Sequence, residues 1–369
     1  MEGETGLGVT MLPGFRDLHV HLREPGFAHK ETIAGVTEAA RRGGYTQICA
    51  MPNVNPPPDC PAHLQTQLEL LRQNAAVTVY PVGAITRGQK GGGELADMQA
   101  IAPYVCGFSD DGRGIQDGKC MRRAMETAAA LGKPILSHCE DESLLGGGYI
   151  NDGSYAVSHG HRGICAESEW VPLARDLELA RQTGCHYHVC HVSTKTSVEL
   201  IRRAKDRGVH VTAETAPHYL LLSDEDLQED GRFKMNPPLR GQADRQALVA
   251  GLLDGTIDCV ATDHAPHTPV EKSKGLAGSA FGIVGLETAF PLLYTYLVKR
   301  CVLSLEQLLE AMSRRPGRLL EQWMGITLPA EDMCAFDLEA RYIIDPNSFA
   351  GKGRSTPFAG WEVYGKRVD

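Results

Sequence analysis

The chain has 369 residues, of which 42% are hydrophobic and 22% charged, a composition typical of one large globular domain. A formal net charge of -9 argues against a nucleic-acid-binding surface. Neither an 18-residue apolar run nor a signal-peptide profile occurs, so we expect no membrane span and a cytoplasmic protein. The 11 cysteines include no CxxC pair and are odd in number, which predicts reduced thiols rather than disulfides or a cysteine-bound metal.

Short apolar segments, each predicted to be a strand, alternate with segments of helical periodicity. The first strand lies within residues 16–26, and seven more are expected at 45–51, 77–84, 104–109, 134–138, 186–191, 210–214 and 258–263. Helices are expected at 30–42, 62–75, 118–131, 167–183, 196–207 and 245–253. This alternation favours parallel pairing, and eight such units close an α/β fold of the TIM-like (β/α)8 barrel type. A doubly wound open sheet is the alternative, but polar residues end nearly every strand rather than those at one switch point.

Two long insertions, residues 140–163 and 265–286, interrupt the alternation. Loops of such length in a compact domain are usually lids or binding loops. After two further expected helices, at 304–312 and 316–324, a strand-like segment at 334–338 is predicted to pack outside the barrel.

The first strand carries His19 and His21. Because side chains alternate along a strand, Asp17, His19 and His21 are predicted on one face, and the apolar residues between and after them on the other. Two imidazoles on one face suit zinc, which binds neutral imidazole nitrogen at about 2.0–2.1 Å. A solvent-facing strand is the ordinary alternative, but Arg23 and a Pro-Gly turn follow at once, as at the start of a binding loop.

Active sites of barrel enzymes lie at the carboxyl ends of the strands. Further candidates at those ends are His138, His191, Asp263 and the neighbours Asp110 and Asp111. Four histidines and two carboxylate positions exceed the ligands of one tetrahedral zinc ion and match two zinc ions that share a carboxylate and a hydroxide. In an alternating strand His186 and His188 face away from His191, so we interpret them as packing residues.

The chain resembles the dihydroorotases of the bacterial class I type, in the amidohydrolase superfamily, through seven segments: HVHLREPG, MPN, FSDDG, SHCED, HVCHVST, MNPPLR and ATDHAPH. The resemblance extends from Leu12 to about Val363 and implies a TIM-like barrel with two zinc ions per subunit. The metal ligands that it implies are His19, His21, Asp111, His138, His191 and Asp263. Many relatives bridge the metals with a carbamylated lysine, which is missing here, so Asp111 is the expected bridge and Asp110 the alternative.

The resemblance also implies a reaction: the reversible cyclisation of N-carbamoyl-L-aspartate to (S)-dihydroorotate, a step of pyrimidine biosynthesis. A zinc-bridged hydroxide is expected to attack the ring amide in the hydrolytic direction, with Asp263 as proton shuttle. The implied substrate-binding residues are His21, Arg23, Asn53, Asn236, His267, Phe281 and Gly282. Arg23 suits the substrate carboxylate because a guanidinium binds it as a bidentate fork.

The chain ends depart from the family pattern, since fewer residues than usual precede Leu12. We expect a metal-dependent barrel over residues 12–325, with residues 1–11 and 326–369 forming an incomplete β-sandwich whose missing edges a partner chain would supply. A homodimer and an association with aspartate transcarbamoylase are the expected assemblies.

Two other functions fit parts of the sequence. A dihydropyrimidinase, hydantoinase or allantoinase would use the same scaffold, but Arg23 and Asn53 suit a substrate that bears a carboxylate, and the bridging lysine usual in those enzymes is missing. An inactive partner of aspartate transcarbamoylase would have lost metal ligands, whereas this chain has all of them.

Overall fold

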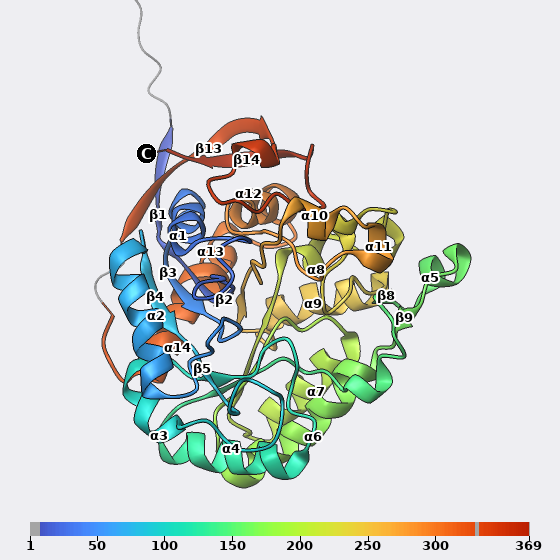
Figure 1. Cartoon of the computed structure of the whole chain (residues 1–369). Helices are drawn as coiled ribbons and strands as arrows, with labels where there is room; N and C mark the ends of the chain where they lie inside the picture. The colour runs from blue at the N-terminus through green and yellow to red at the C-terminus, as the bar shows by residue number, and fades with distance from the viewer. Residues whose placement is uncertain (1–7, 329–331, 369) are drawn as a thin grey trace, which may run out of the picture.

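The computed structural model describes residues 8–328 and 332–368, and its centre is a barrel of parallel strands (Figure 1). Hydrogen bonds order these strands as β2-β3-β4 and β5-β6-β7-β10-β11-β12. They are β2 (Phe15–Val20), β3 (Tyr45–Ala50), β4 (Thr78–Pro81), β5 (Gly83–Ala84), β6 (Phe108–Ser109), β7 (Ile135–Ser137), β10 (Tyr187–Val189), β11 (Val211–Thr215) and β12 (Cys259–Val260). The predicted barrel is confirmed.

Two junctions join these strands into a ring. The expected third strand is divided into β4 and β5 at Val82, whose amide donates to the carbonyl of Ala50 at 2.9 Å. At the other junction Val20 forms a parallel bridge with His264 beyond β12. Beside that bridge the Asp17 carboxylate accepts hydrogen bonds from the Thr262 amide at 3.1 Å and hydroxyl at 2.6 Å. A side chain therefore replaces part of the ladder between β2 and β12.

Long helices lie outside the strands and end close to their predicted bounds: α1 (Ile33–Arg42), α2 (Pro61–Asn74), α4 (Gly118–Ala130), α6 (Glu167–Thr183), α7 (Lys195–Asp206) and α9 (Gln242–Asp254). Local chemistry sets these ends. Thr32 caps α1 by accepting from the Gly35 amide, and Thr194 caps α7 in the same way through Ser197. Gly184 ends α6 in the left-handed conformation that glycine adopts most readily.

Five further helices pack around or under the barrel: α3 (Met98–Ile101), α8 (Pro217–Leu221), α12 (Ala289–Leu293), α13 (Leu305–Leu309) and α14 (Arg315–Met324). The expected helix 304–312 changes after α13 into a π-helical turn, Glu310–Arg314. Leu320 and Trp323 of α14 pack with Leu18, Cys106 and other side chains of the barrel interior, so α14 closes one end of the barrel. Among the described residues, no helix combines the length and apolarity needed to cross a bilayer.

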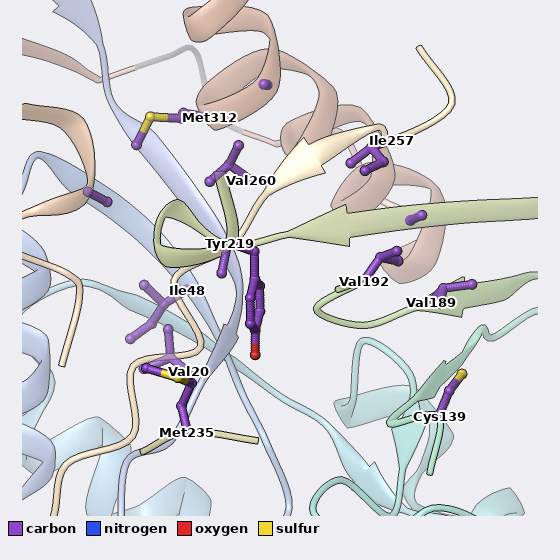
Figure 2. Close-up of a cluster of buried hydrophobic side chains, with 14 of the residues drawn as sticks. Val20, Ile48, Cys139, Val189, Val192, Tyr219, Met235, Ile257, Val260 and Met312 are labelled. Atoms are coloured by element: carbon purple, nitrogen blue, oxygen red, sulfur yellow. The ribbon is translucent and has the colours of Figure 1, made fainter. Parts of the chain in front are cut away.

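Most remaining apolar side chains form one core between the strands and the helices. Figure 2 shows part of it, with Val20, Val189 and Val260 from three strands and Tyr219 from α8. All four side chains are buried. Burial of apolar area at roughly 25 cal/mol per Å² makes this core the main source of stability.

The two insertions are ordered. Residues 140–163 contain β8 (Ile150–Asn151) and α5 (Ser154–His159), and β9 (Gly163–Ile164) pairs with β8; α5 stands away from the body (Figure 1). Residues 265–286 contain α10 (Pro269–Lys272) and α11 (Gly275–Gly278). We call the second insertion the lid.

The chain ends form an antiparallel sheet in the order β1-β13-β14, built from β1 (Val9–Pro13), β13 (Met333–Ile343) and β14 (Glu362–Arg367). The expected strand 334–338 is thus part of β13. Residues 1–7, 329–331 and 369 of the predicted accessory region lie outside the described residues. The boundaries of that region and its completion by a partner chain stay predictions.

Candidate active site

The six side chains predicted as metal ligands meet at the carboxyl ends of the strands, which we call the mouth. They come from β2 or from the residues after β2, β6, β7, β10 and β12, and none is more than 7% exposed: His19, His21, Asp111, His138, His191 and Asp263. Residues far apart in the chain therefore lie together at one rim, as the sequence predicts.

Asp111 lies at the centre of the group. Its Oδ1 is 3.3 Å from His19 Nε2, 3.6 Å from His138 Nδ1 and 3.4 Å from His191 Nε2. Its Oδ2 is 3.5 Å from His21 Nε2. One carboxylate thus contacts imidazoles from both sides of the mouth.

Asp263 completes one side of this group. Its Oδ1 lies 3.0 Å from His21 Nε2 and 3.5 Å from His19 Nε2. The second nitrogen of His21, Nδ1, lies 2.7 Å from Asn53 Oδ1, which fixes the orientation of that ring.

Asp110 turns away from the histidines. Its carboxylate accepts from the backbone amides of Ile85 at 2.8 Å, Thr86 at 3.1 Å and Gly91 at 3.0 Å, and from the Thr86 hydroxyl. It therefore holds the loop that follows β5, and its neighbour Asp111 is the carboxylate at the mouth.

Three buried polar atoms of the mouth lack hydrogen-bond partners among residues 8–328 and 332–368: His19 Nε2, Asp111 Oδ1 and His138 Nε2. An unpaired buried polar atom is costly unless a ligand satisfies it. Two ligands of one tetrahedral zinc ion lie about 3.3 Å apart, and the nitrogen–oxygen distances around Asp111 are 3.3 to 3.6 Å. Two possible cation groups, His19-His21-Asp111 and Asp111-His138-His191, share that carboxylate. The donor set fits a pair of cations.

Charge and backbone geometry also distinguish this site. Burial opposes ionisation of Asp111, but the surrounding His19, His138 and His191 hold its pKa well below the usual value. His191 and Asp263 have positive φ angles of 33° and 50°, and Arg23 has one of 68°. Such angles are uncommon outside glycine and cluster at functional sites.

The strict alternation expected for the first strand is wrong. The register between β2 and β3 shifts between Asp17 and Val20. Leu18 packs in the barrel interior, whereas Val20 and Leu22 belong to the outer core. His19 and His21 still meet, with ring centroids 5.3 Å apart.

A cavity of about 220 Å³ opens beside the cluster. All residues predicted to bind substrate line it: His21, Arg23, Asn53, Asn236, His267, Phe281 and Gly282. The ligand cluster also borders this cavity through Asp111 and Asp263, so one space gives access to both sets of side chains.

Arg23 is a buried cation at the wall of this cavity. Its Nε donates to the carbonyl of Pro266 at 2.9 Å, and its Nη2 lies 3.1 Å from His267 Nε2. Burial lowers the pKa of Arg23 to about 10, so the guanidinium stays charged at neutral pH. An anionic group in the cavity would find its counterion there.

The lid is fixed over the cavity by polar contacts. His267 Nδ1 lies 3.4 Å from the Lys30 ammonium, and its Nε2 lies 2.7 Å from the Phe281 carbonyl oxygen. The buried Lys272 ammonium donates to the carbonyls of Lys234 at 2.9 Å and Ala280 at 2.7 Å. Burial, with the Lys234 charge, lowers the pKa of Lys272 to about 7.

Sequence reasoning missed two buried carboxylates beneath the mouth. Glu140 accepts from Asn236 Nδ2 at 2.6 Å and lies 3.6 Å from His138 Nε2. Glu214 lies 2.7 Å from His19 Nδ1. Both follow the rule that polar residues end the strands, and Glu214 ends the predicted strand 210–214, so position alone could have indicated them.

Comparison with known proteins gives one family. The family described as Dihydro-orotase-like matches residues 8–197. The dihydroorotase of Anoxybacillus flavithermus is 51% identical over 362 residues, which cover 97% of this chain and 84% of that protein. The dihydroorotase of Geobacillus kaustophilus is 51% identical over 363 residues, with the same coverage.

Two solved structures have a similar fold. The L-hydantoinase (dihydropyrimidinase) of Arthrobacter aurescens is 26% identical with a TM-score of 0.84, covering 98% of this chain and 83% of that one. The dihydropyrimidinase of Brevibacillus agri has a TM-score of 0.82 at 20% identity and the same coverage, and shows a shared fold alone.

Proposed function

The chain belongs to the dihydroorotase family, and we propose that it catalyses the reversible cyclisation of N-carbamoyl-L-aspartate to (S)-dihydroorotate. The observation that carries this proposal is that one cavity holds both the histidine and carboxylate cluster and the buried guanidinium of Arg23. A hydrolase of cyclic amides needs the first, and a substrate with a free carboxylate needs the second.

The proposed cofactor is a pair of zinc ions. His19, His21 and Asp263 would hold one, His138 and His191 the other, and Asp111 would bridge them, as the shared position of its carboxylate supports. When bound, zinc supplies Lewis-acid chemistry at the substrate carbonyl and acidifies a water molecule.

The chain's own residues orient the substrate. Arg23 would form a bidentate pair with the substrate carboxylate, which its charge at neutral pH supports. Asn53 and Asn236 line the same cavity and offer amide groups to the ring, and the backbone of Phe281 and Gly282 borders it from the lid. The lid, held by its polar contacts, would exclude bulk water from the reacting amide.

Asp263 is the proposed proton carrier. In the hydrolytic direction its carboxylate takes a proton from the attacking water and gives it to the ring nitrogen that leaves. In the synthetic direction it takes the proton from the ureido nitrogen as the ring closes and gives it to the carboxylate oxygen, which leaves as water. Its position between the imidazoles of His19 and His21 and the cavity supports this role.

A zinc titration of the apo-protein tests the proposal, with dihydroorotate hydrolysis as the readout. Activity is expected to rise to a plateau at two equivalents of zinc per chain. Stoichiometric zinc binding without turnover of dihydroorotate would contradict the enzyme assignment, and binding of less than one equivalent would support an inactive partner of aspartate transcarbamoylase instead.

A hydantoinase or dihydropyrimidinase is the second candidate, favoured by the folds of the solved structures. Two features argue against it. Asp111 lies at the mouth where those enzymes usually have a lysine, and a substrate without a carboxylate would leave the Arg23 guanidinium without an anionic partner. Equal kcat/KM for hydantoin and dihydroorotate would favour this candidate.

The proposal extends to the setting of the enzyme. We propose a cytoplasmic protein with the barrel over residues 12–325 and an accessory sheet from the chain ends, assembled as a homodimer or with aspartate transcarbamoylase. The exposed side chains of Val9, Met11 and Ile343 on that sheet support a partner there. Sedimentation of the chain alone and with aspartate transcarbamoylase tests both assemblies.

A further inference from the structure

A chain of hydrogen bonds begins at the closed end of the barrel. Trp323 Nε1 donates to His186 Nδ1 at 3.2 Å. The indole nitrogen can only donate, so His186 Nδ1 accepts. Burial, with the charges of neighbouring His210, lowers the pKa of His186 to about 2, and the neutral ring therefore carries its hydrogen on Nε2. That nitrogen lies 2.8 Å from Thr212 Oγ1, so the hydroxyl oxygen accepts from it.

The same hydroxyl continues the chain toward the mouth. Having accepted from His186, Thr212 has its own hydrogen to donate to His188 Nδ1 at 2.8 Å. The His188 ring therefore carries its hydrogen on Nε2, which lies 3.1 Å from Glu214 Oε2. Both His188 and Glu214 are fully buried.

Glu214 ends the chain against a proposed metal ligand. Its Oε1 lies 2.7 Å from His19 Nδ1 and accepts from the His191 amide at 3.4 Å. A carboxylate only accepts, so His19 carries its hydrogen on Nδ1. The indole of Trp323 can only donate and the carboxylate of Glu214 can only accept. Both requirements are met when every hydrogen bond between them is donated in the direction from Trp323 to Glu214.

This direction decides which nitrogen of His19 can bind a cation. With a hydrogen fixed on Nδ1, Nε2 is the nitrogen left to offer its lone pair, and it is a buried atom without a hydrogen-bond partner among the described residues. Nε2 faces Asp111 at 3.3 Å. Only the lone pair of a neutral imidazole can bind zinc, so the other tautomer would place a hydrogen where the cation belongs.

We propose that Glu214, held by His188 and Thr212, is a positioning residue that fixes His19 in the Nδ1–H tautomer and presents its Nε2 to the metal. The inference rests on the zinc site of the proposed function. Carboxylates that hold metal-binding histidines in this way typically contribute 10- to 100-fold in metal affinity.

The variant Glu214→Gln tests the proposal, because a neutral amide of the same shape cannot accept from both imidazoles. We expect zinc affinity, measured on the apo-protein by competition with a chelator, to fall by about 10- to 100-fold. In the metal-free protein, ring ¹⁵N NMR should report a hydrogen fixed on Nδ1 of His19 in the wild type, and in the variant that nitrogen should no longer hold its hydrogen fully.

A matched pair of variants at Thr212 provides the second test. Thr212→Val removes the hydroxyl at nearly constant volume and should lower zinc affinity by about three- to tenfold, whereas Thr212→Ser keeps the hydroxyl and should retain wild-type affinity. Asp176→Asn alters a buried carboxylate of α6 that bonds Arg175 and Tyr187 outside the chain of hydrogen bonds, so it should leave zinc affinity unchanged.

Wild-type zinc affinity and an unchanged His19 tautomer in Glu214→Gln would overturn the proposal. If that variant does not fold, equal affinities of Thr212→Val and Thr212→Ser would overturn it as well. None of these readouts needs substrate. An enzyme that binds zinc as described but does not turn over dihydroorotate would therefore refute the proposed function and leave this inference standing.

Discussion

The two ends of the barrel interior both bury polar side chains, yet they treat them differently. At the closed end, His186, His188 and Thr212 are each hydrogen-bonded, and the Lys133 ammonium donates to the Trp323 carbonyl at 2.9 Å. At the mouth, the buried atoms His19 Nε2 and Asp111 Oδ1 have no such partner within the described part of the chain.

This difference distinguishes polar groups that are buried as part of the fold from polar groups that are buried to bind a ligand. A polar group in a protein interior normally finds a hydrogen bond, since leaving it unpaired costs about 1–3 kcal/mol. The closed end follows that rule and needs nothing further. At the mouth the unpaired atoms belong to histidine and aspartate, the residue types that bind metals. The missing hydrogen bonds therefore indicate where a ligand binds.

The largest effect is expected from Asp111→Asn, which changes the carboxylate at the centre of the mouth. Removing the shared carboxylate should abolish binding of both zinc ions and lower kcat/KM by about 10³-fold or more, because metal ions supply several kcal/mol of transition-state stabilisation. Zinc content after dialysis and steady-state kinetics with dihydroorotate check this result.

Asp110→Asn is the matched control for that change. Asp110 is equally buried but bonded to the loop after β5, so the variant should lower the free energy of unfolding by about 1–3 kcal/mol and keep both zinc ions. The two aspartates would have to exchange roles if Asp110→Asn lost zinc and Asp111→Asn did not.

A smaller effect is expected from Arg23→Lys, which leaves the metal cluster intact. Lysine keeps the positive charge but cannot form the bidentate fork, so kcat/KM should fall by at least about tenfold while zinc content stays at the wild-type value. Unchanged kcat/KM for dihydroorotate would remove Arg23 from the substrate site.

The smallest effect concerns Lys272 of the lid, a buried ammonium that donates to the carbonyl oxygens of Lys234 and Ala280. Its pKa is about 7 in the folded chain against 10.5 in the unfolded one. Between these values the unfolded state binds the extra proton, so the free energy of unfolding rises with pH by up to about 1.4 kcal/mol per unit.

Urea unfolding of wild type and Lys272→Met at several pH values above 7 checks this sign. The difference in the free energy of unfolding should move in favour of the wild type as the pH rises. A difference that stays constant with pH would show that Lys272 keeps an ordinary pKa in the folded protein.

The barrel could be predicted from sequence because its signals are local. Apolar runs and helical periodicity each depend on a few neighbouring residues, and the helices that they predict are present. The rim of the site also followed from chain order, since parallel strands bring their carboxyl ends together.

Other features depend on contacts that a sequence pattern does not contain. Alternation failed in β2 because the register shift depends on β3. Alternation also assigned His188 to the face opposite His191 but could not show that Glu214, 26 residues away, lies against it. Likewise Asp110 and Asp111 could be distinguished only once the amide of Ile85 was seen to bond the former.

The bond from Asp17 to Thr262 joins the first and last strands at a point where the backbone ladder is sparse. His19 lies two residues beyond one partner and Asp263 one residue beyond the other. A cation bound by both would link the two strands where few backbone hydrogen bonds join them, so metal loading should slow hydrogen exchange there and raise the temperature at which the barrel unfolds.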